Sequence, residues 1–563
     1  MQRIVQAVKP EIGAVDTETN GLHIINCKPF VVQFGFLDPS NCRGFSFAVD
    51  LENCPIADEV LSYWDKVAHS LKMYMGHNIK FDLHMLANIG HEYKDNNLTD
   101  TTFWIRYGHD ALHPEEGGPL MGLKEYATKY IDRNAKLHEK KLDREKTEIV
   151  KQYNNRLKTM LNNSGLRPPE GYKSFTIKYI DDMFKDCTFE PSDLPDGIRE
   201  VYLDWFTSLP LYLQHKVTSL VEKNMIRYND LNRENLIMYA HYDIIYTLEI
   251  WASLYQIVIN RGQFQGVKIE NQCILPWYEM ERTGFKADKE YLEKCRKDMK
   301  QYIRRKREEL YEIAGTEFSV SSHPTIKEIM KEKFQIEVKS TGNEPLNLLK
   351  NSLEDEEAIK FIDLLQELRT LEKWYAVYIL RFQKELTNND RLYANINSVG
   401  AVSGRVTSDF QQFPKYGINK EDGTPLFHPR KMILTTPGYK GIAYLDYSQV
   451  ELRLQALYTI LVGSPDLNLC RAYMPYKCKH IVNDGSIGCD LYQYHYEDFD
   501  YTNPDHIKHA YDWDWYLDEE LSKKWTPTDV HAATTHVAFP DIDMNSDEFK
   551  KLRGKVGKRV NFA

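Results

Sequence analysis

Short apolar runs alternate with turn residues over the first fifty positions of the chain. Residues 12–15, 29–36 and 44–50 have the composition of strands, and polar segments separate them. Strands that follow one another through short turns pair in antiparallel fashion. The pattern therefore predicts an antiparallel meander at the N-terminus. A later apolar run, residues 71–76, leads into a helical stretch.

Long helical patterns dominate from residue 270 onward, and the helix predicted over residues 294–307 is strongly basic. Further on, the apolar run 441–445 ends on Asp446 and gives way at once to another helical pattern. This arrangement delivers one carboxylate to the mouth of a predicted sheet. A plain strand followed by a helix, with Ser448 and Glu451 as a capping box, explains the same residues without any chemistry.

Length and composition limit the class of protein. With 563 residues, the chain is long enough for three or four domains with sizeable cores. No stretch approaches the roughly 20 apolar residues of a membrane helix, and the N-terminus lacks the apolar segment of a secretion signal. Nine cysteines without regular spacing argue against a disulfide framework and for a reducing, cytoplasmic location. The net charge of −10 decides little about partners, because a large protein can bind DNA through local basic faces.

Carboxylates follow the predicted strands. Asp16 and Glu18 are two residues apart on the first strand, so both side chains point to one face of the sheet. Two neighbouring carboxylates repel each other unless a cation lies between them, which favours a divalent metal. Solvated acids at an exposed strand end are the alternative. Asp82 follows a later apolar run, and Tyr239 lies four residues before Asp243 on one face of a predicted helix.

In sequence order, these side chains resemble the three motifs of the DEDD 3′–5′ exonucleases, Asp16-Thr-Glu18, Asn78-x-x-Phe81-Asp82 and Tyr239-x-x-x-Asp243. Histidine-type members carry a histidine where this chain has Met238, so the resemblance is to the tyrosine type. It implies an RNase H-like domain over residues 1–260. Such a domain hydrolyses phosphodiesters with two Mg²⁺ ions, for which Mn²⁺ is a possible substitute.

The same resemblance assigns roles within this domain. It implies that Asp16 bridges the two ions and that Tyr239 orients the attacking water. Glu18, Asp82 and Asp243 would complete the metal site. Contacts to the terminal nucleotides of a single-stranded 3′ end would come from Thr19, Leu22, Asn78 and Phe81.

An expansion at about residues 130–235 separates the second and third motifs. Its early part, residues 129–158, is rich in lysine and arginine with acids interspersed. A solvated helix with ion pairs explains this composition, and a surface that guides DNA is the alternative.

Residues 446–453 resemble motif A of the DNA polymerase I family, family A. The resemblance implies that the carboxylate of Asp446 holds both polymerase metal ions while the carbonyl of Tyr447 completes one shell. Gln449 and Glu451 would face the incoming nucleotide, and Glu451 would act as a steric gate against a ribose 2′-hydroxyl.

Other segments follow in the family's order. The basic helix and residues 318–342 resemble the thumb. The resemblance implies that the basic side chains contact the phosphates of duplex DNA. A solvated charged face is the alternative. Residues 397–408 resemble a signature that brings Arg405 to the minor groove, and Gln411 follows it. His531 falls on a fingers signature as a triphosphate contact. Lys558 and Phe562 lie one helical turn apart and would face the incoming dNTP.

The sequence ends inside this fingers motif, and no segment supplies the second palm carboxylate of the family. We expect that this polypeptide does not polymerise alone and that a second polypeptide supplies the remainder; a truncated sequence explains the same ending. Residues 462–525 form an unusually long insertion. Its possible zinc ligands lack the spacing of known zinc fingers, so incidental thiols and imidazoles are the alternative to a zinc site; they are Cys470, Cys478, His480, Cys489 and His495.

Taken together, the sequence predicts an α/β chain: an RNase H-like exonuclease domain followed by a partial right-hand polymerase. The expected parts are the exonuclease (1–260), the thumb (261–395), a partial palm (396–460) and an insertion with partial fingers (461–563). The expected partners are primer–template DNA, single-stranded 3′ ends and dNTPs, in the host cytoplasm if the gene belongs to a phage. The alternatives are an autonomous 3′–5′ exonuclease with a DNA-binding C-terminal half and a non-catalytic scaffold for a partner polymerase.

Overall fold

The structure is a computed structural model. It describes residues 1–110, 114–116, 118–168, 173–177, 196–214, 216–217, 220–386, 389–414, 416–447, 449–462, 469, 476–481, 487–490, 514–517 and 529–558. These residues divide into two units, 1–440 and 441–563. No helix of the described residues combines the length and the apolar character that crossing a bilayer requires.

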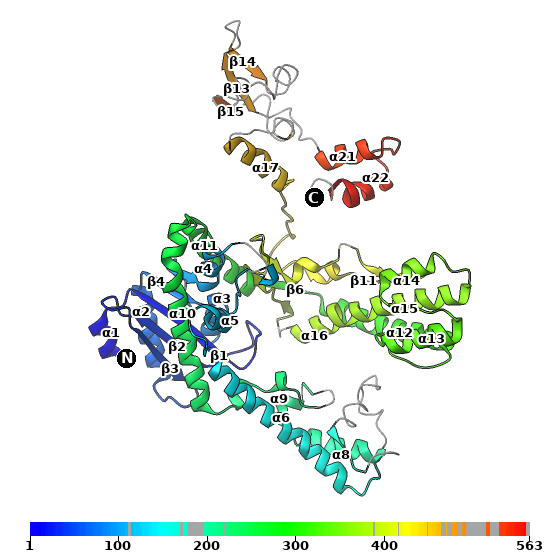
Figure 1. Ribbon diagram of the computed structural model, residues 1–563, viewed down its shortest axis with the longest axis horizontal. Helices are drawn as coiled ribbons and strands as arrows, with labels where there is room; N and C mark the ends of the chain where they lie inside the picture. The colour runs from blue at the N-terminus through cyan, green and yellow to red at the C-terminus, as the bar shows by residue number, and fades with distance from the viewer. Residues whose placement is uncertain are drawn as a thin grey trace. The chain divides into compact units, whose positions relative to one another are not determined.

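A five-stranded mixed sheet organises the first part of unit 1 (Figure 1). Its order is β3 (Gly44–Asp50), β2 (Pro29–Leu37), β1 (Ile12–Thr19), β4 (Met73–Gly76) and β5 (Leu98–Asp100). The strands β1, β2 and β3 pair in antiparallel fashion, so the predicted meander is confirmed, whereas β4 and β5 run parallel to β1.

Helices cover this sheet and complete its core; the sheet and these helices are called the sheet body below, residues 1–130 and 233–283. The helices are α1 (Gln2–Val8), α2 (Ala57–Ser70), α3 (Ile79–Ala87), α4 (Thr101–Gly108), α5 (Leu123–Tyr130), α10 (Arg233–Asn260) and α11 (Phe264–Thr283). The helix α11, which lies beyond the predicted boundary at residue 260, buries Val267, Ile274 and Tyr278 in the core of the sheet body.

The expansion forms a helical arm that leaves the sheet body between α5 and α10 (Figure 1). It contains α6 (Leu137–Asn163), α8 (Asp196–Thr207), α9 (Leu211–Gln214) and the short 3₁₀ turns η3 (Lys223–Met225) and η4 (Tyr228–Asp230). The long helix α6 is not a freely solvated helix, because Leu142, Leu157 and Leu161 are buried in a core that also contains Phe30 and Val31 of β2.

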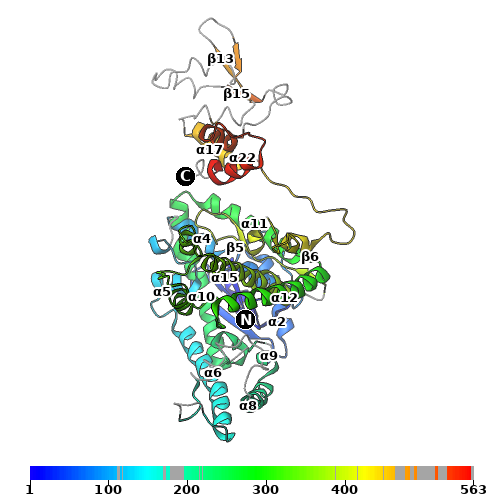
Figure 2. The same cartoon turned by 90° about the vertical axis from the view of Figure 1, so that its right-hand side faces the viewer.

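A second, helical core fills the rest of unit 1 and is called the helical body, residues 285–434 (Figure 2). Its helices are α12 (Lys289–Ala314), α13 (His323–Phe334), α14 (Asn343–Lys350), α15 (Glu356–Trp374), the π-helical turn η5 (Tyr375–Leu380) and α16 (Arg381–Glu385). Short strands join them, with β12 (Ile433–Leu434), β6 (Phe285–Ala287) and β7 (Arg391–Leu392) in one sheet. The other short strands are β8 (Ile396–Asn397), β9 (Thr407–Ser408), β10 (Ile418–Asn419) and β11 (Pro425–Phe427).

Unit 2 contains α17 (Val450–Leu461), β13 (Tyr476–Ile481), β14 (Ile487–Asp490), β15 (Asp514–Leu517), α21 (Val530–Ala538), α22 (Asp547–Leu552) and the π-helical turn η8 (Arg553–Gly557). The helix predicted after Asp446 is therefore confirmed as α17. The strand predicted over residues 441–445 is not present: these residues have no regular structure, and Tyr444 and Leu445 are 85% and 91% exposed. A strand requires a neighbouring strand for its backbone hydrogen bonds, and no neighbouring strand among the described residues pairs with this run.

A buried ionic cluster ties α3 to the segment around β8. The carboxylate of Glu281 on α11 is 1% exposed and accepts hydrogen bonds from the ammonium of Lys80 at 2.5 Å and from the amide of Ile396 at 2.5 Å. Its other oxygen lies 2.7 Å from Nε2 of His84. The Lys80 ammonium also donates to the carbonyl of Ile396. One carboxylate thus holds the helix that carries Asp82 against the start of the Arg405 segment.

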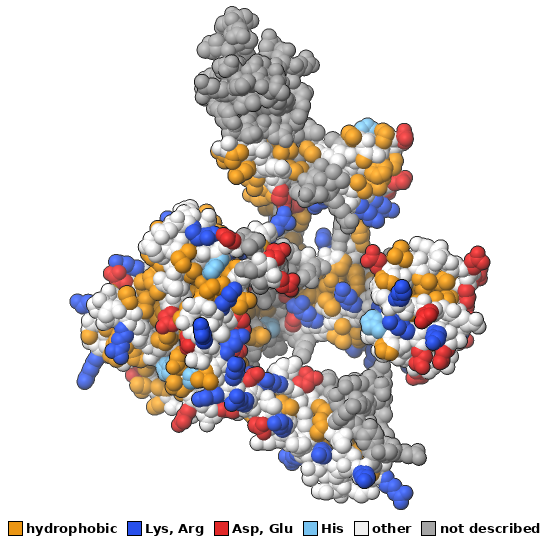
Figure 3. Space-filling view, viewed as in Figure 1, with side chains coloured by type: hydrophobic (Ala, Val, Ile, Leu, Met, Phe, Trp, Pro, Cys, Tyr) orange, Lys and Arg blue, Asp and Glu red, His pale blue; other side chains and the backbone are white. Residues whose placement is uncertain are grey.

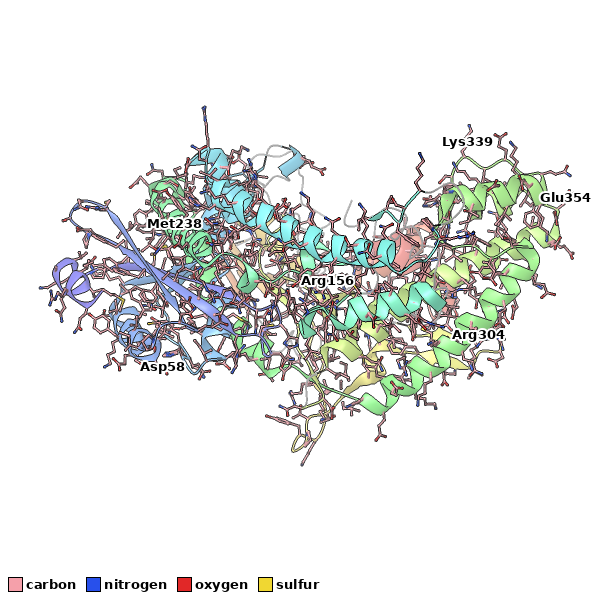
Figure 4. All side chains as sticks on the ribbon, turned by 90° about the horizontal axis from the view of Figure 1, so that it is seen from below. Asp58, Arg156, Met238, Arg304, Lys339 and Glu354 are labelled. Carbon is pink, nitrogen blue, oxygen red and sulfur yellow. The ribbon has the colours of Figure 1, made fainter. Side chains whose placement is uncertain are left out.

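We predict that Glu281→Ala destabilises unit 1 by about 3–5 kcal/mol, because it leaves the Lys80 ammonium buried without its counter-charge. The urea midpoint of the full chain, followed by circular dichroism, measures the loss. Glu308→Ala is the matched control, since its ion pair with Arg304 on α12 is exposed on both sides (Figure 4), and its midpoint should stay close to that of the wild type. Equal midpoints for the two variants would contradict the prediction.

Candidate functional site

The close approach of α10 to the sheet creates the site. A Cβ atom on Gly35 of β2 would lie 2.5 Å from the side chain of Ile244 and 2.2 Å from the carbonyl oxygen of Phe45, so only glycine fits there. Ile244 follows Asp243 on α10. The absence of a side chain at Gly35 therefore lets α10 bring Asp243 down onto β1.

Three carboxylates meet at this point. One oxygen each from Asp16, Glu18 and Asp243 lies within 4.8 Å of the other two. Asp16 pairs with Gln33 across the β1–β2 ladder, and the Gln33 amide donates to the carboxylate of Asp16 and lies 3.5 Å from that of Glu18. The prediction that Asp16 and Glu18 share one face is confirmed.

Asp82 lies beside this cluster, but it does not belong to the group of three carboxylates whose oxygens lie within 4.8 Å of one another. Its buried carboxylate accepts a hydrogen bond of 2.7 Å from the hydroxyl of Thr17, whose strand position lies between Asp16 and Glu18. Asp100 positions the turn that carries Asp82, because its carboxylate accepts from the amides of Asn78 and Ile79 at the start of α3.

Burial and neighbouring negative charges raise the pKa of each of these carboxyl groups. Burial, followed by the charge of Asp243, raises the pKa of Asp16 to about 7. Burial raises the pKa of Asp243 to about 6, against the opposing effect of Lys124. The pKa values of Glu18 and Asp82 lie well above their ordinary range, first through burial and then through the charge of Asp16. An additional positive charge at this point would relieve all four shifts.

Lys124 on α5 supplies one positive charge. Its ammonium pairs with the carboxylate of Asp243, and the two side chains are 6% and 5% exposed. The same ammonium lies 4.5 Å from the centre of the Tyr239 ring. Tyr239 hydrogen-bonds to Asp243, and burial together with the Asp243 charge raises the pKa of Tyr239. Met238, the position of the histidine in the other subclass, is 44% exposed on the outer side of α10 (Figure 4).

The donor set fits divalent cations that prefer oxygen. All three grouped ligands are carboxylates, and no nitrogen or sulfur ligand is grouped with them among the described residues. Mg²⁺ and Mn²⁺ take such ligands. One ammonium against four buried acids also leaves negative charge uncompensated, which a cation would neutralise.

Three of the four residues expected to contact terminal nucleotides line a cavity at α3, the helix that carries Asp82, although none of the four acids lines it. Leu22, Asn78 and Phe81 line a space of about 780 Å³ together with residues of the helical body such as Tyr393 and Arg381. Leu22 is 83% exposed. Thr19 lies at the end of β1, where its hydroxyl donates to the carbonyl of Gly21.

The expected polymerase residues of unit 2 form no comparable cluster. Asp446, Tyr447 and Glu451 are exposed, and no group of three or more metal-ligating side chains among the described residues includes Asp446. Gln449 has a positive φ of 54° at the start of α17. The capping residue Ser448 and the fingers residue Phe562 lie outside the described residues.

His531 and Lys558 lie close together in unit 2. His531 on α21 is 4% exposed, and burial together with the charges of Arg553 and Lys558 lowers its pKa. The turn η8 is π-helical over Arg553–Gly557. A π-helical turn contains more residues than an α-helical turn. The residue one turn before Lys558 is therefore Arg553, whereas in an α-helix it would be Gly554. Arg553 pairs with Asp529 at 2.7 Å.

The remaining residues that were expected to contact DNA lie in the helical body. Arg405 and Gln411 are exposed, and the Gln411 amide donates to the carbonyl of Val406. The basic helix is confirmed as α12, but many of its cations are paired: Arg296 with Glu293, Arg304 with Glu308 and Arg307 with Glu372. Lys306 is 1% exposed.

The proposed zinc ligands are only partly placed. The strands β13 and β14 set Cys478 opposite Cys489 in register, and His480 lies on β13. Cys470 and His495 lie outside the described residues. The zinc site stays a prediction.

Sequence reasoning missed two residues that touch the acids. Gln33 gave a signal, because it is the single polar side chain within the apolar run 29–36. Lys124 gave none, since a lysine on a short amphipathic helix is usually solvated.

Comparisons with known proteins cover the later part of the chain. The profile of DNA polymerase family A matches residues 289–475. DNA polymerase I of Caldicellulosiruptor bescii is 26% identical over 218 residues, which are 38% of this chain and 25% of that protein. DNA polymerase I of Borreliella burgdorferi is 23% identical over 361 residues, 60% of this chain and 37% of that protein. DNA polymerase DpoZ of Vibrio phage phiVC8 is 24% identical over 250 residues, 42% of this chain and 38% of that protein.

The matched segments therefore span about a quarter to two fifths of the length of these relatives. The profile runs from α12 through the helical body to the Asp446 motif. The profile match makes residues 289–475 similar to DNA polymerase family A, and the three relatives are DNA polymerases to which parts of this chain are similar.

Proposed function

We propose that the sheet body is a 3′–5′ exonuclease and that the chain takes part in template-directed DNA synthesis as a proofreading polymerase of family A. The observation that carries the nuclease is the group of Asp16, Glu18 and Asp243 with Tyr239 beside it, in which Glu18 and Asp243 are buried and Asp16 is partly buried. Three carboxylates kept within 4.8 Å of one another are costly for a purely structural core. They are the arrangement that phosphodiester hydrolysis requires.

The residues of the chain have distinct tasks in this reaction. Asp16, Glu18, Asp82 and Asp243 would hold two divalent ions, which supply Lewis acidity for the attacking water and the leaving 3′ oxygen. Gln33 and Thr17 fix the orientation of Asp16 and Asp82 by hydrogen bonds. Tyr239 is fixed by Asp243, so that its hydroxyl can orient the water.

The cavity at α3 fits an unpaired 3′ end. Leu22 is an exposed apolar wedge, while Phe81 and Tyr393 offer ring faces to bases and Asn78 offers an amide. Stacking on aromatic side chains is a sequence-tolerant way to bind single strands. A frayed primer terminus would reach the acids along this cavity.

Polymerisation needs more than the described residues supply. Asp446 belongs to no group of three or more metal-ligating side chains among the described residues, and the run before it exposes Tyr444 and Leu445. We propose that further palm strands carrying a second carboxylate cover this run and complete the dNTP site with His531 and Lys558. The match to a polymerase of a Vibrio phage supports a role in phage DNA replication. An autonomous exonuclease with a DNA-binding C-terminal half is the second candidate. It is favoured because the described residues include a group of three carboxylates in the sheet body and no such group around Asp446.

We predict that the purified chain with Mg²⁺ shortens a 3′-mismatched primer on its template. Asp16→Ala should lower the rate by about 10³-fold, because the cluster supplies several kcal/mol of transition-state stabilisation. Primer length on a denaturing gel is the readout, and Glu308→Ala on α12 is the control. Shortening that survives Asp16→Ala would remove the proposed nuclease.

We also predict that added dNTPs do not extend the primer when the chain acts alone, since one palm carboxylate does not hold two ions. The same gel with dNTPs and a correctly paired primer tests this. Extension by the purified chain that depends on Asp446 would contradict this prediction.

We predict that the metal-free site loses stability as pH rises. The folded pKa of Asp16, about 7, lies above its unfolded value near 3.8, so the contribution of this group is fully present below pH 4 and is lost as pH rises through 7. In EDTA, Asp16→Asn should therefore raise the melting temperature more at pH 8 than at pH 5. Mn²⁺ at pH 8 should stabilise the wild type more than the variant. A variant effect that is independent of both pH and Mn²⁺ would contradict the metal assignment.

A further inference from the structure

The helical arm forms one side of the acidic site. The turn η4 packs against β1, the strand that carries Asp16 and Glu18. Tyr228 of η4 and Tyr239 of α10 belong to the apolar cluster that α6 shares with β2. The two rings stack at 6.0 Å with an interplanar angle of 25°, and a hydrogen bond joins their hydroxyls. The arm is therefore continuous with the residues of the proposed nuclease.

Lys146 of α6 lies over this pair of rings. Its ammonium is 3.6 Å from the centre of the Tyr228 ring, a distance that is typical of a cation–π contact. Tyr228 in turn supports Tyr239, whose other neighbour is Lys124. Each of the two stacked rings thus has the ammonium of a lysine against it: Lys146 of α6 lies over Tyr228, and Lys124 of α5 lies over Tyr239.

The two lysines differ in what they bind. Lys124 is engaged by Asp243. Lys146 forms no ion pair with any residue in the described parts of the chain, although the fields of Asp143, Glu18 and Glu139 reach it. The carboxylate of Asp143 is occupied by Lys223 at 2.6 Å. Lys146 is half-buried, and this burial lowers its pKa. An ammonium in this setting is available to an anion that enters from solvent.

The location suggests which anion this is. Lysine and arginine side chains gather on the surface where α6 leaves the sheet body (Figure 3), which would attract a nucleic-acid strand. Next to this basic surface, the acidic cluster would hold the phosphate of the bond that is hydrolysed through its metal ions. Lys146 lies over the ring of Tyr228, which stacks on the ring of Tyr239. A strand that places one phosphate at the acids would therefore bring a neighbouring phosphate to Lys146.

We propose that Lys146 is a positioning residue that binds a backbone phosphate of the single-stranded 3′ end, with Tyr228 as the platform that holds its ammonium. The helical arm is then part of the substrate site of the nuclease. This proposal rests on the proposed exonuclease. A phosphate contact of this kind is independent of base sequence and weakens with salt.

The test uses the full chain and a 5′-labelled oligothymidylate of six nucleotides, too short to depend on distant DNA-binding surfaces. The exonuclease rate with Mg²⁺ is measured against oligonucleotide concentration at several salt concentrations. Lys146→Met removes the charge and keeps the apolar stem, and Lys146→Arg restores a cation. Lys140→Met, an exposed lysine on the same helix, is the matched control. Thermal melting checks the fold of each variant.

We expect Lys146→Met to raise KM about tenfold with little change in kcat, since one charge-assisted contact is lost. The slope of log(kcat/KM) against log[salt] should become shallower by about 0.7, the value for one phosphate on a single strand. Lys146→Arg should recover most of both effects. Lys140→Met removes one exposed cation of the basic surface at the start of α6, so it should raise KM by less than about twofold.

The proposal is overturned if Lys146→Met and Lys140→Met have the same KM and salt slope, or if Lys146→Met lowers kcat alone. Failure of the underlying function has a different signature, because the wild type itself would then leave the oligonucleotide intact. If Lys146→Met raises KM and also lowers the melting temperature, and if Lys146→Arg restores neither, then Lys146 is a structural residue. This result would also overturn the proposal.

Discussion

Repulsion among four buried carboxylates is the constraint on which the sheet body depends. Asp16, Glu18, Asp82 and Asp243 are held close enough that burial and neighbouring charge raise the pKa of each. A core does not gather such groups without compensation. Gln33 and Thr17 donate hydrogen bonds to two of them, and Lys124 pairs with a third. The remaining deficit of positive charge favours a cation at this point.

The same constraint gives the helical arm a purpose beyond its own packing. The insertion does not pack only on itself. Its elements α6 and η4 share a core with β2, and Tyr228 of η4 stacks on Tyr239. The arm thereby closes one side of the acidic cluster. On the opposite side, Glu281 joins α3 to the Ile396 segment. The site is supported from two directions by elements that are far from it in sequence.

The sequence predicted the elements and acids of this site better than their surroundings. Period-two alternation placed Asp16 and Glu18 on one face, and a helical spacing of four placed Tyr239 beside Asp243, because both depend only on local geometry. Gln33 was detectable as a polar residue in an apolar strand. Lys124 and Lys146 were not, since their positions result from how α5 and α6 pack on the sheet. A lysine-rich helix has the same composition whether one of its lysines faces solvent or a tyrosine ring.

The run 441–445 shows where local pattern fails for a different reason. Its composition is that of a strand, and the helix that follows it forms as expected, but the run itself is exposed and unpaired. A helix satisfies its backbone hydrogen bonds within its own segment, whereas a strand satisfies them only with a neighbour. Sequence therefore specifies α17 by itself and specifies the preceding strand only conditionally. The condition is a partner strand, and the exposed side chains of Tyr444 and Leu445 are the surface that such a strand would cover.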